Sequence, residues 1–247
     1  MVGSNNGAAL MDDSGVFLTK AEIARRQIKK MITSGVVRPG DRITTREVSV
    51  ALGMSETPIR EAIHGLAAEG WLQVQSHIGA VVQGLRADQV LEISTLRGAV
   101  CAMAIQLSAD SYDPPLLDRI DENIVSSEAA LARQDYDHFA ELNHEFHRLL
   151  CDRPQATYCY RILENMLGLM SSQRHGLTVS PHRLTEAIAE HRAIRDQLRL
   201  KNFEAAAELA RQHELRTGVW LIGVFREAER RRAASAEPQR TTEEISG

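Results

Sequence analysis

Histidine and amide side chains recur along the second half of the chain in a pattern that could form a metal site. Asn143 and His147 are four residues apart, so on a helix both point to the same face. His191 and His213 follow in later segments with helical patterns. Imidazole nitrogens suit zinc, nickel, iron or manganese, and helical bundles often hold such metals in their core. Sequence separation alone proves no contact, and a single histidine is more often a core or surface residue.

A metal-dependent hydrolase would need a general base within reach of a metal-bound water. The run His144-Glu145-Phe146-His147 has one residue where the zinc-protease motif HExxH has two between the glutamate and the second histidine. No equivalent motif supplies the base. The sequence therefore predicts a binding protein and no enzyme.

Composition indicates a soluble cytoplasmic protein long enough for two domains. Hydrophobic residues make up 43% of the 247 residues and aromatic residues only 4%, which suits helix-on-helix packing. Cys101, Cys151 and Cys159 form no CxxC pair, so we expect small buried thiols and no disulfide framework. No stretch approaches the roughly 20 apolar residues of a membrane span, and Met1–Ser14 does not resemble a signal peptide.

The net charge of −4 is unevenly distributed. Residues 17–83 hold nine Lys/Arg and six Asp/Glu, whereas residues 84–247 hold 20 and 25. An acidic protein with a basic end can still bind a polyanion, because binding depends on the local potential. The surplus is too modest to establish nucleic-acid binding by itself.

The basic end has the pattern helix, helix, helix, hairpin. Thr19 with Glu22 forms a capping box that starts the first helix. Thr45 is the expected cap of a second helix that Gly53 ends, and Ser55 the expected cap of a third. Residues 71–75 and 80–83 read as two strands around a turn at 76–79.

Only helical patterns follow residue 84. They predict six helices, at about 88–110, 114–133, 135–152, 155–174, 181–200 and 202–227. The expected fold is mostly α: a winged helix-turn-helix of three helices and a β-hairpin wing, then an antiparallel all-α bundle of about six helices. The expected domains are a disordered start at 1–16, a winged-helix domain at 17–83, a helical domain at 84–229, and a flexible tail at 230–247.

The helix–Gly–helix spacing of residues 45–69 lets a second helix enter a DNA major groove, with the hairpin beside it as a wing. The run from Leu52 to Ile63, then Glu69-Gly70-Trp71-Leu72 and Gly79-Ala80, resembles the winged-helix signature of the GntR family of transcription factors. Upstream, Thr45-Arg46-Glu47 fits the same pattern. The resemblance covers residues 18–83.

The resemblance implies contacts to DNA. Arg46 and Arg60 are expected to bind phosphates or guanines, and Ser55 and Thr57 the backbone, while the wing tip with His77 and Gly79 approaches the minor groove. The family usually has Arg where this chain has Glu56. A carboxylate can accept from cytosine N4, so one expectation is an operator that differs from the family's common consensus. A solvated charge that favours the helix N-terminus is an equal alternative.

Residues 88–226 resemble the FCD ligand-binding domain of the family's FadR branch, and six helices resemble its VanR-like subgroup. The matching segments contain Asn143, His147, His191 and His213, which by resemblance hold a metal, with zinc expected first. Asn143 stands where Asp is commoner, so we expect lower metal affinity and a preference for an anionic effector.

Arg97 matches an arginine that faces the family's ligand cavity, which implies a small organic acid as effector; a surface salt bridge is the alternative. The family tends to carry Glu where this chain has Cys101, which implies that Arg97 lacks a charge partner there. We therefore expect a ligand-responsive repressor that binds a near-palindromic operator as a homodimer. An architectural DNA-binding protein with a purely structural metal remains open.

Overall fold

The structure is a computed structural model that describes residues 17–75, 79–173 and 180–236, in two compact units. The first unit holds the described residues up to Leu85 and a segment that begins at Asn165. The second holds Arg86–Glu164 and the described residues from 180 onward. The expected disordered start and most of the tail lie outside the described residues, and so does His77. The predicted domain limits stay a prediction.

Capping side chains and a glycine set the limits of the first helices in this unit. Helix α1 (Lys20–Thr33) starts with the predicted capping box, in which Thr19 and Glu22 exchange hydrogen bonds. Helix α2 (Thr45–Leu52) has a second capping box, and its cap is Thr44 with Glu47. The expectation of a Thr45 cap was wrong by one residue, because Thr44 keeps extended backbone angles. Gly53 ends α2 in the left-handed region with φ 62°, as predicted.

Helix α3 (Glu56–Ala68) is followed by the wing, β2 (Leu72–Gln75) and β3 (Gly79–Val82). Strand β1 (Arg42–Ile43), which the sequence does not predict, pairs antiparallel with β3 and completes a sheet of order β1-β3-β2. Two residues are too few to show an alternating pattern. The core beneath the sheet is a cluster of buried apolar side chains that includes Ile28, Ile43, Ile59, Leu66, Trp71 and Val82.

The end of α7 (Thr157–Ser172) belongs to this unit. Asn165 accepts from the Trp71 indole at 2.7 Å and from Lys29 at 3.2 Å, and its amide donates to the Glu69 carbonyl. A Cβ at Gly168 would lie 2.6 Å from the Trp71 ring. A glycine is therefore needed where the indole packs on the helix.

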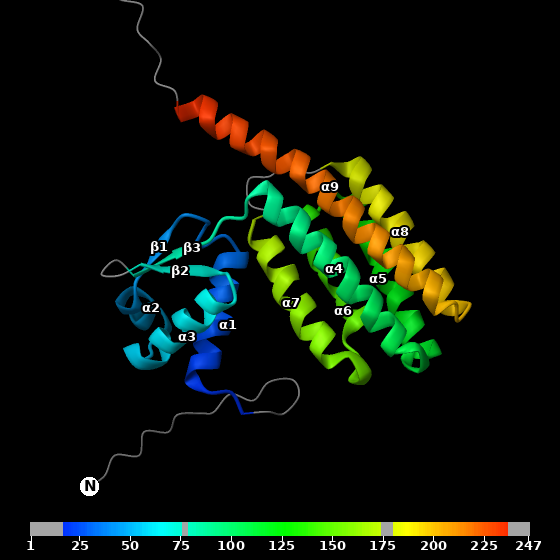
Figure 1. The fold of residues 1–247 in the computed structure, drawn as a ribbon, viewed down its shortest axis with the longest axis horizontal. Coiled ribbons are helices and arrows are strands. Elements are labelled where there is room, and N and C mark those ends of the chain that lie inside the picture. The colour runs from blue at the N-terminus through cyan, green and yellow to red at the C-terminus, as the bar shows by residue number, and fades with distance from the viewer. Residues whose placement is uncertain (1–16, 76–78, 174–179, 237–247) are drawn as a thin grey trace, which may run out of the picture. The chain divides into compact units, whose positions relative to one another are not determined.

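The remaining helices form the second unit, which is all-α as predicted (Figure 1). In the described residues after the wing, six α-helices are present, and α9 ends nine residues later than expected. The helices are α4 (Ala87–Leu107), α5 (Pro114–Ala132), α6 (Tyr136–Cys151), the start of α7, α8 (Pro181–Arg199) and α9 (Phe203–Ala236).

Helices α4 and α9 pack side by side along much of α4 (Figure 1). A Cβ at Gly98 would meet the Arg211 carbonyl at 3.0 Å, and one at Gly218 would meet Ser94 at 2.5 Å. The earlier residue on α4 meets the later residue on α9, so the two helices run antiparallel. At both contacts a glycine lets the helices approach closely. Contrary to expectation, α4 is long and apolar enough to cross a membrane by length and composition alone; 44% of its most apolar window is buried in the protein.

Candidate nucleic-acid interface and metal centre

The first turn of α3 presents polar side chains to solvent. Ile59, Ala62, Ile63 and Leu66 bury one face of the helix. Ser55, Glu56, Thr57 and Arg60 are exposed at its N-terminal end. Ser55 takes the cap position, but its side chain makes no capping hydrogen bond, so the hydroxyl is available to a ligand. Arg60 lies 3.9 Å from Glu56, one turn apart on the exposed surface, where such pairs are weak.

The other predicted DNA contacts lie on α2 and the wing. Arg46 is exposed in the first turn of α2. Gly79 opens β3 with φ 111°, and a Cβ there would lie 2.6 Å from the Ile43 carbonyl, so the start of this strand requires glycine. Whether these residues contact DNA stays a prediction.

Some of the basic side chains of this unit are paired with a carboxylate of the same unit. Arg25 and Lys29 on α1 both lie 2.6 Å from Glu69. Lys29 also lies over the Trp71 ring. These cations support the packing of α1 on the end of α3 and contribute less to an external field than the residue count suggests.

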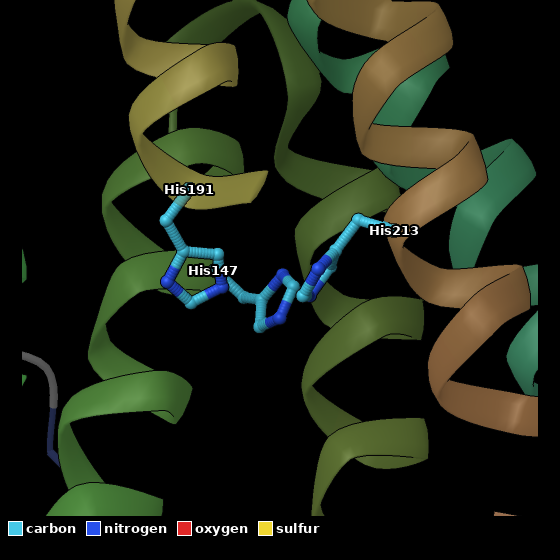
Figure 2. Close-up of side chains that lie close together, drawn as sticks. All are labelled: His147, His191 and His213. Atoms are coloured by element: carbon cyan, nitrogen blue, oxygen red, sulfur yellow. The ribbon is translucent and has the colours of Figure 1, made fainter. Parts of the chain in front are cut away.

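Three of the four predicted metal ligands come together in the second unit. His147 on α6, His191 on α8 and His213 on α9 form the histidine triad, in which the nearest ring nitrogens all lie within 4.8 Å of one another. All three side chains are buried. Figure 2 shows the rings turned toward one another from three helices. Phe146 stacks on His191 with 3.6 Å between ring centroids, which restricts the orientation of that imidazole.

Two glutamates next in sequence to triad histidines lie beside other members of the triad. Glu190 accepts from His213 Nδ1 at 2.6 Å, and Glu214 lies 3.4 Å from His147 Nδ1. A carboxylate at Nδ1 directs Nε2 toward a ligand, as in many metal sites. Burial raises the pKa of Glu190, but hydrogen bonds from His213 and Arg183 outweigh it, and the pKa falls to about 2. Glu190 is therefore charged at neutral pH.

An arginine holds each of these glutamates. Arg183 Nη2 donates to Glu190 at 2.9 Å, and Arg97 Nη2 donates to Glu214 at 2.8 Å. The family resemblance predicts no charge partner for Arg97, because Cys101 stands where a glutamate is common. Glu214, from α9, supplies that partner, while the Cys101 thiol lies 3.3 Å from that of Cys151. Arg97 is buried, so the alternative of a surface salt bridge is wrong.

The triad fits a divalent transition metal. Both ring nitrogens of His147 and of His191 are buried without a hydrogen-bond partner among the described residues, which is costly unless a ligand binds them. Burial lowers the pKa of both rings well below the usual value, with smaller effects from neighbouring charges. Neutral imidazoles offer lone pairs to a metal. Asn143 lies one turn before His147 and is half-buried; its role as a fourth ligand stays a prediction.

Residues 20–82 match the gntR family of bacterial regulatory proteins, and residues 92–216 match the FCD domain. The chain belongs to the GntR family. Together the two matches cover both units of this GntR protein, in the order that the sequence analysis predicted. Because the matched family and its relatives are transcriptional regulators, this GntR protein is a regulator and not an enzyme.

Curated relatives and solved structures agree. The chain is 31% identical over 188 residues to the HTH-type regulator YdhC of Bacillus subtilis, which covers 76% of this chain and 84% of YdhC. It is 27% identical over 191 residues to the transcriptional repressor RspR of Escherichia coli, covering 76% and 82%. The fold is similar to that of E. coli McbR/YncC, with a TM-score of 0.72 at 22% identity over 84% of this chain and 98% of that one.

Proposed function

We propose that this GntR regulator is a ligand-responsive repressor that binds a near-palindromic operator as a homodimer in the cytoplasm. The observation that carries the DNA-reading part is α3, whose buried apolar face leaves the polar first turn free to enter a major groove. RspR and a probable repressor of a D-xylose utilization operon in Paenarthrobacter nicotinovorans, which is 27% identical over 206 residues, support the sign of regulation.

Arg60→Ala tests this docking. Arg60 is exposed and loosely paired, so its guanidinium is available to a phosphate or a guanine. We expect operator affinity to fall several fold and the slope of log K against log salt to flatten by about one. Fluorescence anisotropy at several salt concentrations measures both. Arg211→Ala, an exposed arginine on α9, is the control and should change neither. Unchanged affinity and slope for Arg60→Ala would contradict the docking.

The effector site is proposed at the histidine triad. His147, His191 and His213, with Asn143, would hold a divalent metal, zinc first and nickel, manganese or iron as alternatives. A bound cation would supply a coordination point for an oxygen of a small organic acid. Arg97 would bind the acid's carboxylate through the Nε–H that Glu214 leaves unpaired.

The effector would regulate by binding two arrangements of the dimer with different affinity, one of them competent for DNA. A purely architectural protein would have no such ligand. Thermal shifts against organic acids separate the two, because a ligand of the native state raises the melting temperature by mass action.

Exposed apolar side chains support the homodimer. Leu96, Met103 and Leu107 lie on one stripe of α4, and Leu215 and Val219 lie one turn apart on α9; together they are the α4/α9 apolar residues. Contiguous exposed apolar surface in a soluble protein commonly marks an interface. A second copy of this chain is the proposed partner.

A further inference from the structure

We propose that the effector is a dianion and that Arg183, together with Arg97, is its second anion-binding residue. This inference rests on the proposed effector site at the histidine triad and narrows the class of acid that it takes. It is carried by two buried guanidinium groups with unpaired donors and by the charge that a metal would add beside them.

Arg183 is buried, with 7% of its side chain exposed, in the first turn of α8. Its Nη2 donates to Glu190 at 2.9 Å and to the Thr217 hydroxyl at 2.8 Å. Its Nε is buried without a hydrogen-bond partner among the described residues, and its buried Nη1 lies 3.7 Å from the Glu186 carboxylate, too far for a hydrogen bond. A buried N–H group without an acceptor is destabilising, and more so on a charged group, so we expect these N–H groups to bind an acceptor.

Arg97 repeats this arrangement from α4. Its Nη2 donates to Glu214, 5% of its side chain is exposed, and its Nε is buried without a partner in the described part of the chain. The two chains of contacts, Arg97–Glu214–His147 and Arg183–Glu190–His213, thus both lead to the triad. Each arginine donates to its glutamate through Nη2, and its Nε–H is left without an acceptor and is available to a ligand.

Charge decides the class of ligand. Two buried arginines and two glutamates lie around the triad: Arg97 with Glu214, and Arg183 with Glu190. The half-exposed pair partners of this group, Arg216 and Glu186, add one charge of each sign, so the described side chains balance. A divalent cation on three neutral imidazoles would then leave two positive charges, and the amide of Asn143 offsets neither. Buried charge is costly unless it is paired. A dianion neutralises the site, whereas a monoanion leaves one charge uncompensated.

The test uses the full-length, zinc-loaded protein in isothermal titration calorimetry. The probes are malonate, succinate and glutarate, each compared with its monoamide, which has nearly the same shape and one charge fewer. Inorganic phosphate and methyl phosphate form a second arm that separates a phosphate dianion from a dicarboxylate. We expect at least one dianion to bind wild type tenfold or more tightly than its singly charged match.

Arg183→Gln should weaken that dianion at least tenfold and change the singly charged match less than about threefold. Arg192→Gln is the control on the same helix, because Arg192 is half exposed and pairs with Glu128 away from the triad; it should leave all affinities unchanged. Arg183→Lys keeps the charge and should retain part of the preference. If Arg183→Gln does not fold, the wild-type comparison of dianion and monoamide still decides the charge preference.

Zinc content and operator binding, measured on the same samples, keep this inference separate from the proposed function. If wild type holds zinc and binds its operator but prefers no dianion, the inference fails and the regulator stands. If Arg183→Gln weakens the affinity for the dianion and for the monoamide equally, Arg183 has only a structural role, and its assignment as an anion-binding residue is overturned. If wild type holds no zinc, the metal part of the proposed function fails and the charge argument fails with it.

Discussion

At the scale of single residues, the triad depends on partners that orient its rings. Glu190 contacts His213, Arg183 and Arg216, so one carboxylate ties together α8 and α9. Its hydrogen bond at Nδ1 leaves Nε2 of His213 as the metal-facing nitrogen. Removing the carboxylate's charge should therefore weaken the site without removing a ligand.

Glu190→Gln should lower zinc affinity about 10- to 100-fold, the usual effect of losing an outer carboxylate partner of a ligating histidine. Competition with a chromogenic chelator measures it. Glu141→Gln is the control, since Glu141 is on α6, which carries His147, and 72% of its side chain is exposed. The outer-partner role would be refuted if both variants held zinc equally well, or if zinc bound elsewhere, as shown by undiminished binding in His213→Ala.

The histidines could be predicted from the sequence, whereas their partners could not. His147, His191 and His213 were identified through a resemblance to a family, and the structure brings them together. Glu190 and Glu214 adjoin two of them in sequence, but each contacts a histidine on a different helix. Such pairing depends on how α6, α8 and α9 rotate against one another, which spacing along one helix does not encode. Arg183 gave no sequence signal beyond its charge.

At the scale of elements, the close contact of α4 and α9 depends on glycine at specific points. Gly218 and Gly223 lie on the same helix five residues apart. A Cβ at Gly218 would lie 2.5 Å from Ser94, whereas a Cβ at Gly223 would meet nothing within 4 Å. The same substitution should therefore have opposite effects at the two positions.

Gly218→Ala should destabilise the protein by about 1–3 kcal/mol, because overpacking at α4 outweighs the gain in helix propensity. Gly223→Ala should stabilise it by about 0.5–1 kcal/mol through propensity alone. Urea unfolding followed by circular dichroism measures both. Equal effects of the two substitutions would show that α4 and α9 do not approach as closely as the structure indicates.

The sequence predicts the order and type of the helices and strands better than the residues at which they begin and end. Gly53, Pro114 and Pro181 mark helix ends by backbone chemistry that acts locally, and these breaks were predicted. β1 was missed because its partner β3 lies almost 40 residues away, so its pairing is a tertiary effect. Helix α9 extends to Ala236 through a run of Arg, Ala and Glu. That run lacks an apolar period but has high helix propensity.

At the scale of the whole molecule, dimerisation would join two DNA-reading units on one operator. A lone winged helix contacts one half-site, and a linked second copy raises affinity by roughly 10²–10⁴ when both half-sites are reached together. Helix α4 is apolar on its buried and its exposed faces, which explains both its membrane-like composition and its proposed interface. A substitution that prevents dimerisation should therefore also lower the affinity for the operator.

Leu96→Glu places a charge among the α4/α9 apolar residues, next to the closest approach of the two helices. We expect a monomer in size-exclusion chromatography with light scattering, and operator affinity at least a hundredfold lower on the full palindrome. Affinity for a single half-site duplex should stay within about threefold, because α3 is untouched. Val125→Glu, at a still more exposed apolar position on α5, should leave the dimer intact. A Leu96→Glu protein that remains dimeric would place the interface elsewhere, and equal losses on palindrome and half-site would show that the substitution damages the DNA-reading unit itself.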